Sequence, residues 1–228
     1  MRVLLGALDS PARFVPVDIS GEHLLEAISD LTALHPTLTV HPVVGDFTQD
    51  IELPPGSRRV GFFPGSSIGN FEPAQAAALL RRFAARLSGG ALLIGVDLVK
   101  DPALLHAAYN DHSGVTAAFN LNLWLRANRE AGADFDLSQW MHSAFYNPPL
   151  QRIEMHLVSR RSQRVTVAGH RFDFAEGESV HTENSYKYTV DGFQELARTA
   201  GFTPREVWTD PDRKFSLHWL VSAQAGSE

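Results

Sequence analysis

The chain has 228 residues, of which 44% are hydrophobic and 20% are charged, and its net charge is −6. This composition fits a soluble globular protein with one core, or with one core and an appendage. The sequence contains no cysteine, which excludes disulfides, thiolate catalysis and zinc held by cysteine.

The charge pattern also limits the kind of partner. No Lys/Arg cluster extends beyond Arg160-Arg161, so no basic face for a nucleic acid is expected. No apolar run approaches the roughly 20 residues of a membrane span, and no secretory signal pattern opens the chain. No histidine pair has the helical i, i+4 spacing, with a nearby carboxylate, of a metalloprotease site, so no metal is expected. We therefore expect a cytoplasmic protein, a monomer, whose partner is a small molecule.

The first half of the chain alternates strands with helices. Strands are predicted at residues 14–18, 38–44, 59–63 and 92–96, and helices at residues 21–34 and 73–87. This alternation is typical of a doubly wound α/β sheet. Met1–Leu8 has the pattern of the end of the helix that opens such a fold. We expect the fold to lack its first strand and glycine-rich loop, because neither pattern precedes this helix in the sequence.

The second half changes character. Helices are predicted at residues 102–109, 114–131 and 191–200, and residues 152–159 and 164–167 are expected to pair antiparallel. Closing strands are predicted at residues 207–209 and 215–222. The sheet should therefore be parallel first and antiparallel last. We expect a core at residues 1–108, an inserted substrate-binding part of α+β type at 109–188, and a return to the core at 189–228.

Two acidic residues follow predicted strands, where an open α/β sheet binds its ligands. Asp18 can accept hydrogen bonds from the two hydroxyls of a ribose; alternatively it caps the helix that begins at Gly21. The ribose interpretation is favoured because Ser20 is the better cap. Asp46-Phe47 can contact an adenine ring, or it is an ordinary turn with one core phenylalanine.

Further polar groups lie in loops and in the inserted part. Gly65–Asn70 (GSSIGN) matches neither the dinucleotide nor the phosphate-loop pattern, and alone it would be a flexible loop. Three charged residues, Asp97, Lys100 and Asp101, could be solvated loop charges, and this interpretation is favoured for Lys100. Tyr109 is compatible with an ordinary core position. Glu183 and Ser185 are two residues apart, so on a strand they share a face. They could hold a ring N–H or an ammonium group there, or line a solvated edge.

Taken together, several long stretches resemble one family, the S-adenosylmethionine-dependent L-histidine Nα-methyltransferases of ergothioneine biosynthesis. They are FFPGSSIGN (62–70), LLIGVDLVKDP (92–102), AAYNDHSGVTAAFNLN (107–122), RANREAGADFDL (126–137), RIEMHL (152–157) and HTENSYKY (181–188). The resemblance implies a class I methyltransferase fold of Rossmann type, with S-adenosylmethionine as cofactor. It also implies that the chain methylates the α-amine of L-histidine up to the trimethyl betaine, hercynine.

The resemblance further implies a role for individual residues. Cofactor binding falls to Asp18, Asp46, Phe47 and Gly65, and substrate binding to Asn70, Tyr109, Met155, Glu183, Asn184 and Ser185. Of these, Asn70 and Tyr109 would orient the reacting amino acid at the catalytic centre, and Glu183 with Ser185 would read the imidazole.

Two alternatives remain open at this point. The chain could methylate the nitrogen of another amino acid. It could also be an inactive form that binds histidine without the cofactor loop.

Overall fold

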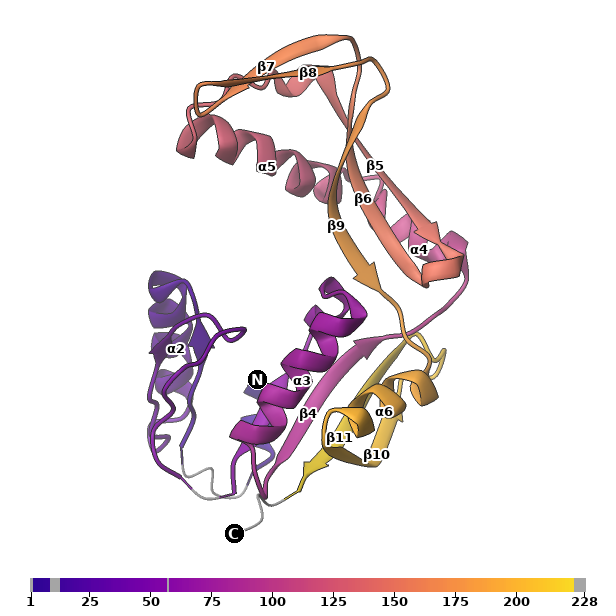
Figure 1. Cartoon of the computed structure of the whole chain (residues 1–228). Helices are drawn as coiled ribbons and strands as arrows, with labels where there is room; N and C mark the ends of the chain where they lie inside the picture. Colours follow the sequence, from indigo (N-terminus) through magenta and orange to yellow (C-terminus); the bar gives the residue numbers. More distant parts are fainter. Residues whose placement is uncertain (1, 9–12, 57, 224–228) are drawn as a thin grey trace. The chain divides into compact units, whose positions relative to one another are not determined.

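The computed structural model describes residues 2–8, 13–56 and 58–223, and it comprises two compact units, residues 1–57 and 58–228. Figure 1 shows the elements of both units. Each unit is described by itself.

The first unit contains two short parallel strands and two helices. Strand β1 (Val17–Asp18) pairs with β2 (Val43–Val44), and α1 (Arg2–Gly6) and α2 (Gly21–Leu34) complete the unit. Helix α2 has the predicted bounds. Its Leu31 packs with Leu5 and Leu38 in a small core, as the apolar spacing of the helix requires.

The second unit is organised around a four-stranded sheet. Its strands are β3 (Val60–Phe63), β4 (Ala91–Asp97), β10 (Phe202–Thr209) and β11 (Phe215–Ser222), in the order β10-β11-β4-β3. Only β3 and β4 run parallel, and β11 pairs antiparallel with both β4 and β10. The prediction of a sheet that is parallel first and antiparallel last is therefore confirmed for this unit.

Two helices lie on one face of this sheet. Figure 1 shows α3 (Pro73–Arg86) and α6 (Val190–Thr199) in front of β4 and β11. Leu79 and Leu80 of α3 and Phe193 of α6 are buried against this face. Helix α3 begins at the predicted proline because proline fixes a helical φ and lacks an N–H, which the first turn does not use.

A second sheet contains β5 (Trp140–Asn147), β6 (Arg152–Ser159) and β9 (Ser179–Tyr186), with β6 in the middle. The predicted pairing of residues 152–159 with 164–167 is wrong. Strand β7 (Gln163–Val167) instead pairs with β8 (His170–Phe174). The two residues between them, Ala168 and Gly169, have φ of 48° and 81°. Positive φ at both central residues is the geometry of a tight hairpin turn, so the local pairing prevails.

Helices cover this second sheet. Helix α4 (Pro102–Tyr109) and helix α5 (Val115–Glu130) follow β4 and pack against β5. Trp124 of α5 stacks on Phe135 with ring centroids 3.9 Å apart, and Trp140 of β5 meets both rings edge-on. Short 3₁₀ turns occur at η1 (Ser67–Asn70), η2 (Leu137–Gln139) and η3 (Pro148–Leu150). Among the described residues, no helix is long and apolar enough to cross a membrane.

Candidate functional site

A polar cleft opens at the carboxyl ends of β3 and β4, within the second unit. Its volume is about 380 Å³, and the second sheet supplies its other wall through β9. The lining residues are Gly65, Ser66, Ser67, Asn70, Asp97, Tyr109, Glu183, Ser185, Lys187 and Phe215. The cleft therefore gathers five residues that the sequence selected from three separate segments: Gly65, Asn70, Tyr109, Glu183 and Ser185.

The loop after β3 reaches the cleft through an unusual backbone path. Gly65 and Ser66 have φ of 78° and 59°, and the second value is uncommon for a residue with a side chain. The Ser66 hydroxyl accepts a hydrogen bond from the Asp97 N–H at 2.8 Å, which fixes the loop to the end of β4. This tie holds the left-handed backbone that directs η1 toward β9.

Gly69 allows η1 to touch the backbone of β9. A Cβ atom at Gly69 would lie 2.6 Å from the carbonyl oxygen of Tyr186, closer than real Cβ contacts come. Only a residue without a side chain permits this approach. Asn70, the next residue, is thereby placed at the cleft with an exposed amide that can donate and accept hydrogen bonds.

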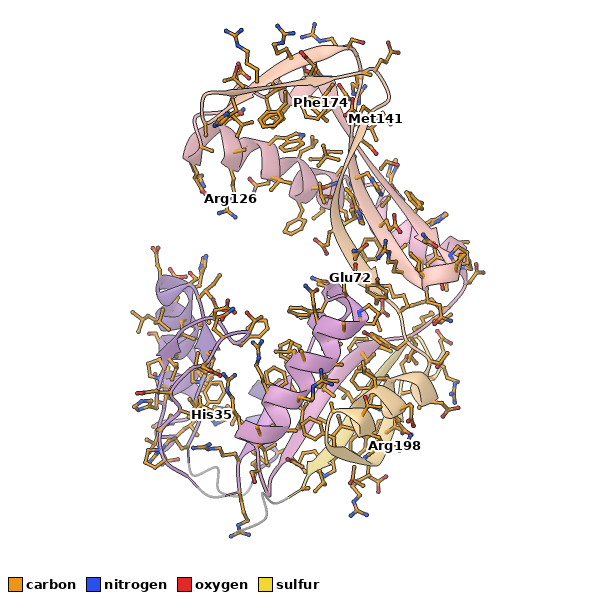
Figure 2. The ribbon with its side chains drawn as sticks, in the orientation of Figure 1. His35, Glu72, Arg126, Met141, Phe174 and Arg198 are labelled. Carbon is orange, nitrogen blue, oxygen red and sulfur yellow. The ribbon has the colours of Figure 1, made fainter. Side chains whose placement is uncertain are left out.

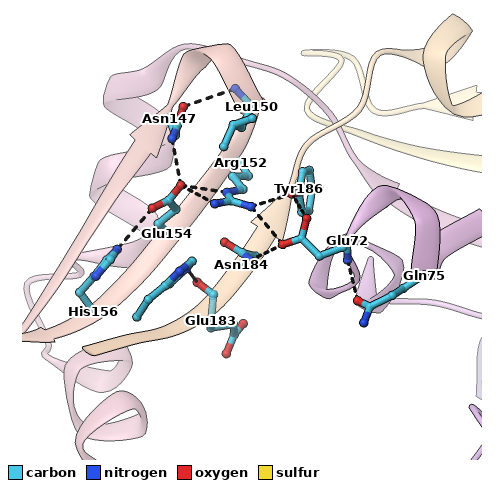
Figure 3. Close-up of polar contacts among 11 residues, drawn as sticks. Glu72, Gln75, Asn147, Leu150, Arg152, Glu154, His156, Glu183, Asn184 and Tyr186 are labelled. Atoms are coloured by element: carbon cyan, nitrogen blue, oxygen red, sulfur yellow. Dashed lines mark hydrogen bonds and ion pairs between the residues drawn. The ribbon is translucent and has the colours of Figure 1, made fainter. Parts of the chain in front are cut away.

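A second tie joins the start of α3 to the second sheet (Figure 3). Figure 2 labels Glu72, from which this tie begins, at the start of α3. The Glu72 carboxylate accepts hydrogen bonds from Arg152 at 3.1 Å, from Asn184 at 2.9 Å and from the Tyr186 hydroxyl at 2.5 Å. Charge-assisted bonds of this kind are stronger than neutral ones. Two contacts therefore hold the loop that carries Asn70 against the second sheet: Gly69 touches the Tyr186 backbone, and Glu72 bonds Arg152, Asn184 and Tyr186.

Lys187 forms the floor of the cleft. Its side chain is 1% exposed, and its Nζ lies 2.9 Å from Asp97 Oδ2, 2.6 Å from Ser185 Oγ and 3.0 Å from the Tyr109 hydroxyl oxygen. An ammonium group has three N–H donors, so these acceptors satisfy all of them. The buried cation is therefore fully paired, and it fixes both Tyr109 and Ser185.

The hydroxyl of Ser185 is left as a donor toward the cleft. Its oxygen accepts from Lys187 and also from the Tyr109 hydroxyl at 2.7 Å, so both lone pairs are engaged. The remaining function of a serine hydroxyl is donation of its own proton. Glu183, on the same face of β9, supplies an acceptor carboxylate. Burial raises the pKa of Glu183 above its ordinary value, and the positive charge of Lys187 opposes that rise.

A β-bulge sets the direction of Glu183. Met155 pairs with Glu183 and His156 pairs with His181, so Thr182 is the extra residue of β9. The Thr182 hydroxyl donates to the Met155 carbonyl and to Asn120 of α5, which anchors the bulge. The bulge places His181 on the face opposite Glu183, although the two are only two residues apart.

Two of the predicted substrate residues do not line the cleft. Met155 is 2% exposed and packs with Leu105, Ala144 and Ile153 in the core on which Tyr109 rests. Asn184 is turned toward Glu72, while Glu183 points away from that network (Figure 3). Their predicted roles in substrate binding remain predictions.

The three predicted cofactor residues of the first unit lie at the carboxyl ends of its parallel strands. Asp18 ends β1, and its Oδ1 accepts from the N–H of Ser20 at 2.8 Å, which leaves Oδ2 without a partner among the described residues. Asp46 follows β2 and accepts from the N–H and the hydroxyl of Thr48. Phe47, the next residue, is half-buried. Adjacent parallel strands bring their ends to one edge, so both acids share that edge.

Sequence reasoning missed Lys187, left Asp97 as a possible loop charge, and was wrong about Lys100. Lys100 is not a solvated loop charge: its side chain is 18% exposed and pairs with Asp97. Asp97 thus lies between two lysines that are 87 positions apart in sequence. The one signal available was a lysine at the end of the polar stretch 181–188, two positions after Ser185 and therefore on its face.

Comparison with known proteins gives a consistent answer. Residues 1–222 match the family described as "Histidine-specific methyltransferase, SAM-dependent". The chain is 40% identical to the histidine N-alpha-methyltransferase of Mycolicibacterium smegmatis over 227 residues, which are 96% of this chain and 71% of that protein. It is 39% identical to the enzyme of the same name from Mycobacterium tuberculosis, over 95% of this chain and 70% of that protein.

Solved structures show the fold. The PH0226 protein from Pyrococcus horikoshii has a TM-score of 0.52 and 12% identity, covering 96% of this chain and 87% of that one. The CcbJ methyltransferase from Streptomyces caelestis has a TM-score of 0.50 and 15% identity, covering 97% and 93%. The expected class I methyltransferase fold is confirmed by these likenesses. The family match over residues 1–222 and the two mycobacterial relatives show that this chain belongs to the S-adenosylmethionine-dependent, histidine-specific methyltransferases.

Proposed function

We propose that this enzyme transfers methyl groups from S-adenosylmethionine to the α-amine of L-histidine and forms the trimethylated betaine for ergothioneine biosynthesis. The family match and the two mycobacterial relatives support this reaction. A relative from Neurospora crassa, 26% identical over 98% of this chain, is named ergothioneine biosynthesis protein 1. The observation that carries the proposal is the pairing of an acceptor, Glu183, with a donor, Ser185, on one wall of the cleft.

This pairing fits a neutral imidazole. The ring has one N–H and one bare nitrogen, so a carboxylate can accept from the first while a hydroxyl donates to the second. An indole offers only an N–H, and an aliphatic side chain offers neither. Lys187 enforces the arrangement, because its bond to the Ser185 oxygen commits that hydroxyl to donation. The cleft thus distinguishes histidine from other amino acids by its polar pattern.

The α-amine end of the substrate falls to Asn70. The role of Tyr109 toward the α-carboxylate stays a prediction, because its hydroxyl already donates to Ser185 at 2.7 Å. The Asn70 side chain presents a carbonyl oxygen that can accept from the α-amine and so orient its lone pair. The Tyr109 ring lies against Lys187, whose Nζ is 4.9 Å from the ring centroid, so the buried cation also positions Tyr109. Asn70 at one end and the Glu183–Ser185 pair at the other would fix the amino acid, which is the positioning that a displacement reaction needs.

Each unit by itself offers groups that suit the cofactor. In the first unit, Asp18 has a carboxylate oxygen available for a ribose hydroxyl. In the second unit, no atom lies within 4 Å of the position that a Cβ of Gly65 would take. A ligand can therefore approach the Gly65 backbone closely. The cofactor supplies an electrophilic methyl group on its sulfonium.

The protein must then hold a neutral amine so that its nitrogen, the methyl carbon and the sulfonium sulfur lie in line. The α-amine of a free amino acid is mostly protonated at physiological pH, because its own carboxylate stabilises the ammonium form, so it must lose a proton before it can attack. The amine proton can leave to water before each transfer. No general base is needed, and the acceleration comes mainly from orientation.

The direct test is product analysis. Purified chain is mixed with S-adenosylmethionine and L-histidine, and mass spectrometry follows mono-, di- and trimethylated histidine. Parallel reactions contain L-tryptophan, L-tyrosine or L-phenylalanine at the same concentration. Trimethylated histidine with little product from the other acceptors supports the proposal. Faster methylation of another amino acid would replace histidine as the substrate, and cofactor-dependent binding of histidine without product would refute the transfer reaction.

A further inference from the structure

A cluster of metal-ligand side chains lies on the face of the second sheet that is opposite the cleft. Glu154 and His156 are two residues apart on β6, and His181 is the cross-strand partner of His156 on β9. One ligand atom from each of the three lies within 4.8 Å of the others. Glu154 Oε2 and His156 Nε2 are 3.4 Å apart, which is close to the separation of two ligands on one tetrahedral ion with bonds of about 2.0–2.1 Å.

The other polar atom of each ligand is already engaged. Glu154 Oε1 accepts from Arg152 Nε and from Asn147 Nδ2, both at 2.9 Å, so Oε2 is the oxygen directed at His156 (Figure 3). His156 Nδ1 lies 3.4 Å from the Ser179 hydroxyl, which leaves Nε2 toward the cluster. Supports of this kind, bound to the far side of each ligand, are characteristic of protein metal sites.

The tautomer of His181 follows from its backbone partner. Its Nε2 lies 3.1 Å from the carbonyl oxygen of Glu183, and a carbonyl can only accept. Nε2 therefore carries the proton, and Nδ1 of the neutral ring bears a lone pair. A histidine that donates its second N–H to a backbone carbonyl is the usual arrangement of a metal ligand.

We propose that Glu154, His156 and His181 bind a divalent transition-metal ion of the Zn²⁺ class, with two imidazole nitrogens and one carboxylate oxygen as ligands. Imidazole favours Zn²⁺, Cu²⁺ and Ni²⁺ over Mg²⁺ and Ca²⁺, which prefer an all-oxygen set. Three protein ligands leave a fourth position for water. Arg152 carries a positive charge near the ion, but Glu72 and Glu154 both pair with it and offset that charge.

Binding requires a movement that the structure permits. The rings of His156 and His181 stack with centroids 4.6 Å apart and planes 11° apart, so their lone pairs run side by side. The exposed His181 ring must turn about its Cβ–Cγ bond to direct Nδ1 at the shared ion.

The test is a titration of the untagged, chelator-treated chain with ZnCl₂ by isothermal calorimetry. L-Histidine is left out because it binds Zn²⁺ itself. We expect one equivalent bound, and at least a tenfold weaker affinity in His181→Ala. His170→Ala, which removes an exposed histidine of β8, should bind as the unaltered chain does. Equal affinity in His181→Ala, or no binding by the unaltered chain, would overturn the proposal.

A second measurement guards against a folding artefact. His156→Gln and Glu154→Gln alter partly buried positions, so circular dichroism must first show that each variant is folded. Co²⁺ bound by nitrogen and oxygen ligands at low coordination number absorbs in the visible range, and the unaltered chain should show this band. A folded His156→Gln or Glu154→Gln variant should lack this visible Co²⁺ absorption. If a folded variant keeps the absorption, the assigned ligands are wrong.

Discussion

Lys187 and Asp97 form an ion pair beneath the cleft, with Nζ 2.9 Å from Oδ2 and a lysine side chain that is 1% exposed. The pair joins the end of β4 in the four-stranded sheet to the residue directly after β9 in the second sheet. It therefore supports both the fold and the cleft, since the same ammonium also holds Tyr109 and Ser185.

Replacement of Lys187 by methionine should impair both stability and substrate binding. Removal of one partner from a buried ion pair typically lowers the free energy of unfolding by about 3–5 kcal/mol. We expect a loss near the lower end, about 3 kcal/mol, because Lys100 still pairs with Asp97. Urea unfolding measures this loss, and steady-state kinetics should show a KM for L-histidine raised at least tenfold. Lys214→Met, which removes a half-exposed lysine, should change stability by less than about 0.5 kcal/mol. An unaltered KM in folded Lys187→Met would contradict the positioning role.

Glu183 should determine acceptor selectivity rather than the rate of transfer. Loss of a hydrogen bond to a charged group costs about 1.5–3 kcal/mol, which corresponds to a KM raised about 10- to 100-fold. Glu183→Ala should show this rise for L-histidine, with a smaller change in kcat. Glu183→Gln retains a carbonyl oxygen in the same place and should lose less. Full preference for histidine over tryptophan in Glu183→Ala, measured by competition, would exclude the imidazole role.

Gly69→Ala should displace η1 from β9. The added Cβ would lie 2.6 Å from the Tyr186 carbonyl oxygen, so the loop must shift, at a cost of about 1–3 kcal/mol in thermal or urea unfolding. Activity should fall with it, because Asn70 is the next residue. Gly56→Ala is the matched control, since no atom lies within 4 Å of its added Cβ. Wild-type stability and activity in Gly69→Ala would show that the loop does not depend on this contact.

His218 should make stability depend on pH. This histidine is fully buried beside Phe193, its Nδ1 has no partner, and burial lowers its pKa to about 4. In the unfolded chain it titrates near 6.5. The unfolded state therefore binds the proton first as pH falls, so stability is complete above about pH 6.5 and is lost progressively toward pH 4.

The size of this loss can be measured directly. A shift of about 2.5 pKa units corresponds to about 3 kcal/mol, as an upper bound. Urea unfolding between pH 7 and pH 4 should show the decline, and His218→Phe should remove that part of it. A decline of the same size in folded His218→Phe would mean that other groups are responsible.

Local sequence determined much of the fold. Helices α2 and α4 have their predicted bounds, and α3 differs by one residue, because their apolar spacing and the prolines at the start of α3 and α4 act within a few positions. Strand β11 was also predicted with its bounds, and in the structure its side chains alternate between half-buried and buried. The family resemblance, which rests on long uninterrupted motifs, is confirmed by the family match.

Tertiary structure decided what those elements do together. The partners of β6 were not evident from sequence, since pairing depends on which strand edges meet after long excursions of the chain. The role of Lys187 depends on Asp97, 90 positions earlier, and the opposite directions of His181 and Glu183 depend on one extra residue at Thr182. Sequence spacing fixes which face a side chain takes only while a strand stays regular, and a buried charge acquires its meaning only from the groups that folding brings to it.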